Sequence, residues 1–357
     1  ARIHTSDGVE EAVYVKDQSI DFCRKQALKS AMMQSAKLLN SSSFDEIEKL
    51  IKDALVLGTD NNFGHDFHKD ALRRFELAAR DPITTGWSQM DEICKGGLGN
   101  SELGVVVAPT GAGKSMVLVH LATQALLLGK TVVYYTLELK DTTVGQRFDC
   151  CLTKTHLGEH KQKKEEILKK IEDIDGTLII KEYPTKSASV QTIKNHIEKL
   201  RKRGINPDII LLDYADLLRP VRSSSEKRHE LEETYEGLRG LAQSYDIPCW
   251  TASQTNRGGL NAEVITMEAI SEAFNKCFVA DFIFSLSRTT LDKQSNKGRV
   301  FIAKNRNGPD GIVFDAHVDW SDVTINILDR NESVEKMQTT TEARKILKEK
   351  YEELQRK

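Results

Sequence analysis

The sequence has no long apolar stretch, no excess of positive charge and no cysteine pair at metal-binding spacing. No run reaches the roughly 18 consecutive apolar residues that identify a membrane-spanning helix, which argues against a membrane protein. The 51 Lys and Arg residues against 53 Asp and Glu give a net charge of −2. Because a protein that coats DNA over a broad surface is usually basic, any nucleic acid is expected to contact a local strip or loops.

The six cysteines show no CxxC spacing, and Cys150 and Cys151 are adjacent in a segment with a helical pattern. We interpret all six as reduced, structural thiols in preference to metal ligands or disulfides. Reduced thiols favour a cytoplasmic location. The chain begins Ala1-Arg2-Ile3-His4, without a methionine or the apolar core of a signal peptide. We therefore expect a processed chain or a piece of a longer one.

A length of 357 residues accommodates one large domain and a smaller appendage. The first part has a helical pattern, with a capping-box sequence at Ser43 and a polar, turn-rich linker at 58–64. An amphipathic helix is predicted at Asp66–Ala79, ending before Pro82. We divide the chain into a helical N-terminal region (1–62), a linker helix (63–82), a large domain (83–330) and a charged tail (331–357).

From residue 83, short apolar runs alternate with helical stretches. The predicted strands are residues 104–108, 132–136, 208–213, 248–252, 281–286 and 299–304. Helices are predicted at Ser115–Leu128, Ser189–Arg203 and Glu230–Tyr245. This alternation predicts an α/β fold with a mainly parallel sheet. The runs at 312–318 and 323–328 have no helix between them, which predicts antiparallel strands at one edge.

The segment Ala108–Ser115, APTGAGKS, follows an apolar strand and begins a helix. Its glycines let backbone N–H groups turn around phosphate oxygens, Lys114 reaches the β- and γ-phosphates, and the Ser115 hydroxyl coordinates Mg²⁺. The pattern usually begins with Gly, and we expect the small side chain of Ala108 to be tolerated. We predict a site for ATP with Mg²⁺ formed by Pro109, Thr110, Gly111, Ala112, Gly113, Lys114 and Ser115.

Two carboxylates follow predicted strands. Asp213 ends the apolar run IILLD, and in P-loop enzymes such a residue holds the Mg²⁺ shell. Many strands end in Asp, so the assignment depends on the phosphate loop. Glu138 lies just after the strand that follows the phosphate loop, where it would polarise the water that attacks the γ-phosphate. A solvated Glu at a strand end is the alternative.

Three further polar residues lie at strand ends. Gln254 can contact the γ-phosphate and report its loss to a neighbouring loop, or it is a surface residue. Lys304 and Arg306 end the last helix-flanked strand in the run AKNRNGPDG. They are either solvated or fingers that reach the nucleotide of an adjacent subunit. Such a finger is worth roughly 10³–10⁵ in rate.

Together these segments resemble the DnaB family of hexameric replicative helicases, especially its phage relatives of the T-even type. The resemblance spans about Pro82 to Leu328. The segments that carry it are TTGW (Thr84–Trp87), GGL (Gly96–Leu98), APTGAGKS, YTLEL (Tyr135–Leu139), LLDYADLL (Leu211–Leu218), ASQTNR (Ala252–Arg257) and KNRNG (Lys304–Gly308).

The resemblance implies a RecA-like core, a homo-hexameric ring with ATP at each subunit boundary, and DNA unwinding at a replication fork. It implies Glu138 as catalytic base, Gln254 as γ-phosphate sensor, and Lys304 with Arg306 acting across the boundary. It also implies a linker helix that docks on the adjacent subunit, with primase and a helicase loader as partners. Residues 1–62 are short for the family's N-terminal collar, which leaves the last two partners in doubt.

The resemblance implies that single-stranded DNA threads the ring, contacting loops after Asp213 and Gln254. The candidate loops are Arg219–Arg228 and Gly258–Glu272. The first carries serines between its cations in place of aromatic residues, which favours contact with the phosphate backbone without base readout. Its candidate DNA-contacting residues are Arg219, Arg222, Lys227 and Arg228. A recombinase filament on the same core, and an ATP-gated scaffold without unwinding, are the alternative functions.

Overall fold

The computed structural model describes residues 80–220, 227–255, 264–265 and 277–328, with shorter stretches between residues 23 and 72. The chain divides into two compact units, Ala1–Ala78 and Ala79–Lys357. In the first unit, residues 25–38 are helical, as predicted. Within the predicted linker helix, Phe67–Lys69 and Ala71–Leu72 form turns, and residues 73–79 lie outside the described residues. The charged tail at 331–357 also lies outside them.

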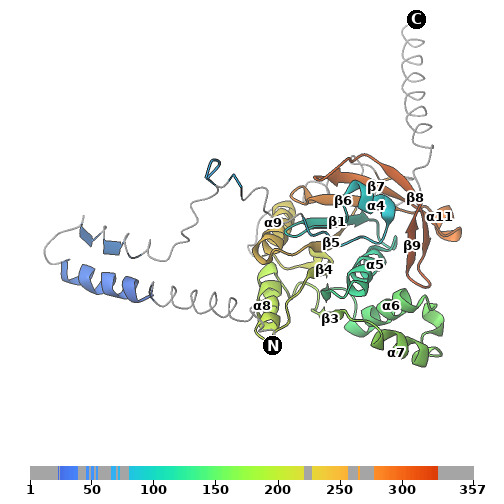
Figure 1. Ribbon diagram of the computed structural model, residues 1–357, viewed down its shortest axis with the longest axis horizontal. Coiled ribbons are helices and arrows are strands. Elements are labelled where there is room, and N and C mark those ends of the chain that lie inside the picture. Colours follow the sequence, from blue (N-terminus) through green and yellow to red (C-terminus); the bar gives the residue numbers. More distant parts are fainter. Residues whose placement is uncertain are drawn as a thin grey trace, which may run out of the picture. The chain divides into compact units, whose positions relative to one another are not determined.

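A nine-stranded sheet forms the centre of the second unit, with strand order β3-β2-β4-β5-β1-β6-β7-β8-β9 (Figure 1). Strands β1 to β6 are parallel to one another, which confirms the predicted α/β class. Their bounds are Leu103–Ala108 (β1), Thr131–Thr136 (β2), Thr177–Glu182 (β3), Ile209–Asp213 (β4), Cys249–Gln254 (β5) and Phe282–Ser287 (β6).

Strand β7 (Lys297–Asn305) runs antiparallel to β6, and β8 (Val313–Asp319) and β9 (Thr324–Ile327) continue the antiparallel part. The sequence predicted antiparallel strands only for the last two runs. The chain between β6 and β7 holds one short helix, α11 (Thr290–Gln294), whereas a parallel crossover needs a dozen or more residues. The reversal therefore begins one strand earlier than predicted.

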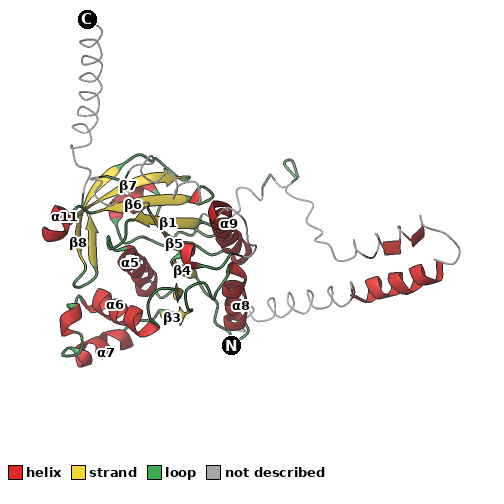
Figure 2. Cartoon of the chain, turned by 180° about the vertical axis from the view of Figure 1, so that it is seen from behind, coloured by secondary structure: helices red, strands yellow, loops and turns green. Residues whose placement is uncertain are grey.

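Helices cover both faces of the sheet (Figure 1; Figure 2). On one face a hydrophobic core joins the sheet to α4, α5 and α6, and on the other a second core joins it to α8 and α9. The helices are α4 (Ser88–Ile93), α5 (Lys114–Leu127), α6 (Asp141–Thr153), α7 (Lys164–Glu172), α8 (Val190–Arg201) and α9 (Lys227–Tyr245), with 3-10 turns η2 (Leu157–Glu159) and η3 (Ala215–Leu217).

Strand β1 lies between these two cores. All six of its residues are buried, with Val106 facing the α5 side and Val105 and Val107 facing the α9 side. A continuous apolar run is typical of a parallel strand that is covered on both faces. Because β1 is central, the loop that follows Ala108 emerges in the middle of the carboxyl edge of the sheet.

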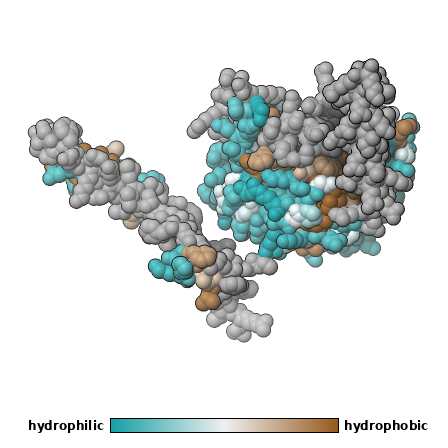
Figure 3. Space-filling model, turned by 90° about the horizontal axis from the view of Figure 1, so that it is seen from above, coloured by the Kyte–Doolittle hydropathy of each residue, from teal (hydrophilic) through white to brown (hydrophobic). Residues whose placement is uncertain are grey.

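On the face of the second unit seen in Figure 3, the described residues are mainly hydrophilic, and apolar side chains show only in limited areas. Within the described part of the chain, no helix combines the length and the apolar character needed to cross a bilayer.

Candidate active site

The phosphate loop connects β1 to α5 in a conformation that requires glycine. Gly111 has φ 73° and Gly113 has φ 109°, both in the left-handed region. A Cβ atom on Gly113 would lie 2.1 Å from the ring of Trp320, which comes from the turn between β8 and β9. Gly113 is also the N-cap of α5, so the free N–H groups of the helix begin beside it. The loop can thus surround an anion with backbone donors.

Lys114 is nearly buried and folds back against the loop. Its Nζ donates to the carbonyl oxygens of Ala108 (3.3 Å) and Pro109 (3.2 Å). The same ammonium lies 5.6 Å from the ring centroid of Tyr214, the residue after β4. The charge is therefore held at the mouth of the loop, beside the position that phosphate oxygens would take.

Asp213 lies beside the loop, and its buried carboxylate has only part of its hydrogen-bonding capacity satisfied. It is fully buried, and its Oδ2 accepts a hydrogen bond from the Tyr134 hydroxyl at 3.3 Å. Its Oδ1 has no partner among the described residues. Burial raises the pKa of Asp213 above its ordinary value; the Ser115 hydroxyl opposes that shift, and the negative charge of Glu138 adds to it.

The hydroxyl of Ser115 and the carboxylate of Asp213 fit a Mg²⁺ ion. Mg²⁺ takes oxygen ligands and keeps several waters, with one or two protein groups and the substrate phosphates completing its shell. The described residues contain no group of three or more His, Cys, Asp or Glu that could hold a metal alone. The Oδ1 of Asp213, which has no hydrogen-bond partner among the described residues, is the oxygen that such an ion could contact.

Gln254, at the end of β5, contacts the phosphate loop directly. Its Nε2 donates to the Thr110 hydroxyl at 2.6 Å, and its Oε1 accepts from the Tyr214 hydroxyl at 3.4 Å. Its backbone N–H donates to Asp216, whose other oxygen accepts from Tyr235 of α9. These contacts tie Gln254 to both the loop and α9.

A hollow of about 270 Å³ lies in front of these residues. The predicted Glu138 and Gln254 border it, as do Thr110, Gly111, Gly113, Lys114 and Ser115 of the phosphate loop. The structure thus brings together the residues predicted to bind and hydrolyse the nucleotide, apart from Lys304 and Arg306. Sequence reasoning missed Met116, Leu139, Arg147, Tyr214 and Trp320, which also border the hollow.

The missed residues differ in the signal that they offered. Arg147 follows Glu138 by nine positions on α6, and Tyr214 directly follows Asp213, so both are near a predicted residue in the sequence. Trp320 is separated from the phosphate loop by some 200 positions, and only the course of the β8–β9 hairpin brings it there. No local pattern could have assigned Trp320 to this site.

Lys304 and Arg306 lie at the end of the sheet where β6 and β1 begin, opposite the phosphate loop. Asn305 pairs with Phe282, the first residue of β6, and Phe282 pairs with Gly104 near the start of β1. The phosphate loop follows Ala108 at the other end of β1, about 17 Å away at roughly 3.3 Å per residue. Within one chain, these two cations do not face the nucleotide hollow.

The candidate DNA-contacting residues are only partly described. Arg219 is exposed, and its backbone N–H donates to the Ala188 carbonyl at 2.8 Å. Arg228, in the first turn of α9, pairs with Glu232 at 3.0 Å. Lys227 begins α9, but its side chain, like all of Arg222, lies outside the described residues. Of the second candidate loop, only residues 264–265 are described.

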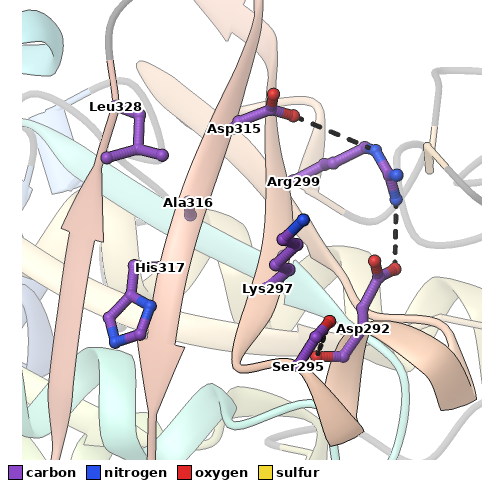
Figure 4. Close-up of a pocket in the computed structure, with 9 residues that line it drawn as sticks. Asp292, Ser295, Lys297, Arg299, Asp315, Ala316, His317 and Leu328 are labelled. Carbon is purple, nitrogen blue, oxygen red and sulfur yellow. Dashed lines mark hydrogen bonds and ion pairs between the residues drawn. The ribbon is translucent and has the colours of Figure 1, made fainter.

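A second hollow, of about 310 Å³, lies between α11 and strands β7 and β8. In Figure 4, Arg299 reaches toward Asp292 and Asp315, while Lys297 and His317 border the same space. The Arg299–Asp292 distance is 3.0 Å and the Arg299–Asp315 distance is 4.0 Å. None of the residues predicted to bind nucleotide borders this hollow.

The family model described as the DnaB-like helicase C terminal domain matches residues 82–321. The chain belongs to this family. The DnaB-like replicative helicase of Enterobacteria phage T4 is 28% identical over 261 residues, covering 68% of this chain and 54% of that protein. The replicative DNA helicase DnaC of Bacillus subtilis is 25% identical over 338 residues, covering 91% and 71%.

Two solved structures share the fold. One, an isolated ATPase domain, matches with a TM-score of 0.64 at 16% identity, covering 74% of this chain and 100% of that one. A DnaB-like replicative helicase, whose structure was described with its primase interactions, matches with a TM-score of 0.62 at 17% identity, covering 87% and 78%. The chain spans about half the length of the first curated relatives it matches.

Proposed function

We propose that this protein is an ATP-dependent replicative DNA helicase that works as a homo-hexameric ring. It translocates on single-stranded DNA and unwinds the duplex at a replication fork, in the cytoplasm of a bacterium or of a phage-infected cell. Membership of the DnaB-like family supports this function. The single observation that carries it is the placement of phosphate loop and cation pair at opposite edges of one sheet.

That placement favours a composite site. A subunit whose Lys304 and Arg306 point away from its own phosphate loop can use them only on the nucleotide of a neighbour. Such a boundary joins two different surfaces of the same subunit, head to tail. Head-to-tail contacts generate a closed ring when the rotation between neighbours returns to its start. Each nucleotide would then contact the phosphate loop of one subunit and the cations of the next.

Within this boundary, each residue has a proposed task. Backbone N–H groups of the loop and Lys114 bind the phosphates of ATP, and Ser115 and Asp213 hold Mg²⁺, which supplies charge neutralisation on the phosphate oxygens. Glu138 accepts a proton from the attacking water, and Gln254 contacts the γ-phosphate. Arg306 of the neighbouring subunit, with Lys304, stabilises the charge that develops on the transferred phosphoryl group.

The test is strand separation on a forked DNA duplex by the assembled protein. We expect ATP-dependent unwinding that the Lys114→Ala variant lacks, because that variant has no side chain on the β- and γ-phosphates. ATP hydrolysis without strand separation by the intact oligomer would contradict the helicase function and favour a scaffold. Helical filaments in place of closed rings, seen by electron microscopy, would favour a recombinase.

Action across the boundary is tested by mixing two inactive variants. Arg306→Ala and Glu138→Ala subunits should each be inactive alone, while mixed assemblies should contain some boundaries with both groups intact. We expect ATP hydrolysis to recover in the mixture. No recovery at any mixing ratio would contradict a trans-acting Arg306.

The remaining partners are proposed on the same basis. One of the two matching helicases was described with its primase interactions, and we propose primase and a helicase loader as partners of this chain. Pull-down of the cognate primase by the full chain, compared with residues 80–328 alone, would test whether the N-terminal region carries that contact.

A further inference from the structure

Asp281 joins three elements at the amino edge of the sheet. It is the residue before β6, and its side chain is 6% exposed. Its Oδ2 accepts from the backbone N–H of Leu103 in β1 at 3.0 Å. Arg239 of α9 and Arg306, the residue after β7, both bring guanidinium groups to the same carboxylate. A buried carboxylate without such partners would be strongly unfavourable.

The two arginines hold Asp281 unequally. Arg239 forms a fork, with Nε 3.1 Å from Oδ2 and Nη2 3.0 Å from Oδ1, and its side chain is 26% exposed. The ion pair of Arg306 is a single contact, Nη1 to Oδ1 at 3.0 Å, and its side chain is 45% exposed. Bidentate arginine–carboxylate pairs are the stronger and more fixed arrangement. Arg306 can therefore leave without depriving Asp281 of a counterion.

The backbone of Arg306 is anchored to Asp281, while its side chain is about half exposed. Its N–H donates to the carbonyl oxygen of Asp281 at 3.0 Å. Nearby, the Lys304 ammonium donates to the Phe278 carbonyl and lies 4.5 Å from the centroid of the Phe278 ring. Burial lowers the pKa of Lys304, and the positive charge of Arg306 lowers it further. Two arginines thus pair with one carboxylate while Lys304 lies near them, which leaves a surplus of positive charge among these described residues.

Another carboxylate near this edge does not remove that surplus. Glu102 is held by Arg80, with distances of 2.6 Å from Nε to Oε1 and from Nη2 to Oε2. It also accepts from the side chain of Asn307 at 2.9 Å. Its charge is matched within its own pair, so the acidic partner of Arg306 is Asp281.

We propose that Asp281 is a positioning residue that holds Arg306 in its own subunit, and that Arg239 allows its release toward the triphosphate of the neighbouring subunit. The inference rests on the proposed function, because it takes that triphosphate as the second destination of Arg306. Arg239 remains on Asp281 in both positions and keeps the buried carboxylate neutralised. Arg306 exchanges one carboxylate for the phosphate oxygens.

The arrangement predicts opposite effects for its two fixed members. Without Arg239, Arg306 is the remaining cation on a buried carboxylate, so it is held back from the neighbour. Without the charge of Asp281, nothing holds Arg306 back. A merely structural role would instead lower thermal stability and leave kcat of the assembled protein at the parent value. Because neighbours in one ion-pair cluster are not additive in stability, only kcat separates the two roles.

The experiment compares R239Q, D281N and the double variant R239Q/D281N in the assembled full chain. We expect R239Q to lower kcat for ATP hydrolysis roughly tenfold, a small part of what an arginine finger is worth, with KM for ATP unchanged. The double variant should recover to within about threefold of the parent, since both charges of the fixed pair are gone. Recovery is judged on kcat of the assembled protein, because the double variant can regain thermal stability even where the pair is only structural.

Arg299→Gln is the matched control. Arg299 is 25% exposed and pairs at 3.0 Å with Asp292, which is 10% exposed, so the two pairs resemble each other in burial and distance. R299Q should lower thermal stability about as much as R239Q while leaving kcat at the parent value. Assembly is followed by light scattering for every variant, so that a dissociated protein is recognised.

Two results would overturn the proposal: R239Q with unchanged kcat, or a double variant no more active than R239Q. If mixed Arg306→Ala and Glu138→Ala subunits still recover activity, either outcome contradicts only the holding role of Asp281 and Arg239, and the trans action of Arg306 stands. If that mixture fails as well, the trans action of Arg306 fails first, and the holding role fails with it.

Discussion

At the scale of single residues, Asp213 shows how function opposes stability. The carboxylate is fully buried, and one of its oxygens lacks a partner within the described residues. Burial raises its pKa above the ordinary value of 3.8, so the ionised form is disfavoured in the folded protein. With a raised pKa, its contribution to stability is greatest at pH below that ordinary value and is lost as pH rises through the folded-state pKa.

We therefore expect Asp213→Asn to stabilise the nucleotide-free protein at pH 7 while lowering Mg²⁺-dependent ATP hydrolysis. Each kcal/mol gained should raise Tm by about 2–4 °C in a unit of this size. The gain should shrink as the pH falls toward 4, because the parent carboxyl is then protonated as well. Thermal melts at several pH values check this, and a lower Tm at pH 7 would contradict it.

Gly113→Ala should destabilise the protein and weaken ATP binding. The added methyl meets both a φ of 109° and the ring of Trp320 at 2.1 Å. The left-handed conformation alone costs roughly 1–2 kcal/mol for a residue with a side chain. Thermal melts and binding of a fluorescent ATP analogue measure the two effects.

The control for this substitution is Gly204→Ala. Gly204 also has a positive φ, of 78°, but a Cβ there would meet nothing within 4 Å. It should lose only the conformational part and bind ATP normally. If both variants lost the same free energy of unfolding, the contact between Trp320 and the loop would contribute nothing to stability.

At the scale of elements, the ends of β1 and β5 bring the phosphate loop into contact with Gln254. Their last residues, Ala108 and Gln254, are register partners, and the Gln254 side chain reaches Thr110. The second candidate DNA-contacting loop follows Gln254 in the sequence. With Gln254 in its proposed role, a change at the γ-phosphate would be passed to the chain that leaves β5.

We expect Gln254→Ala to lower DNA-stimulated ATP hydrolysis by roughly 100- to 1,000-fold while ATP affinity stays near the parent value, since removing one hydrogen-bond donor that acts in the transition state costs about that much. Hydrolysis rates with and without single-stranded DNA, beside equilibrium binding of a non-hydrolysable analogue, check it. Gln191→Ala, which removes an exposed Gln on α8 whose side chain donates to Asn195, is the control. Loss of ATP affinity equal to the loss of rate would contradict a sensor role.

The elements that the sequence predicted are those with a local signal. Strand β1 and the loop after it are read from consecutive residues, and the predicted helix at Ser115–Leu128 corresponds to α5 within one residue at each end. Strand β3 was missed because it is an edge strand whose residues are exposed or only partly buried, so its sequence TLIIKE lacks a buried-strand pattern. Helix α6 was indicated only by the helical pattern around Cys150 and Cys151, without bounds, and α7 was not predicted.

The candidate site divides in the same way. Motifs predicted its phosphate loop, Glu138 and Gln254, which the fold brings to one hollow. Trp320 and the Arg239–Asp281 pair depend on contacts between residues far apart in the chain, 42 positions for that pair and about 200 for Trp320 and the loop. Tertiary packing decides such contacts, and no periodicity or spacing in the sequence records them.

At the scale of the whole molecule, the proposed function makes a lone subunit incomplete, because phosphate loop and cation pair lie at opposite ends of the parallel strands. We expect ATP hydrolysis per subunit to fall steeply on dilution below the concentration at which the ring dissociates. Hydrolysis rates and light scattering over the same dilution series should show one midpoint. A rate per subunit that is independent of concentration, with dissociation demonstrated, would contradict a site built from two subunits.

Helix α9 connects the two edges of the sheet. It begins with Lys227 on the side where β4 ends and finishes before β5 starts, a length of about 28 Å for its 19 residues. Arg228 lies in its first turn. Further along, Tyr235 donates to Asp216, which also accepts from Gln254, and Arg239 pairs with Asp281. If neighbouring subunits meet as proposed, an axial shift of α9 would move its contacts with Asp216 and with Asp281 together, so this one helix would couple a subunit's own ATP site to the next one.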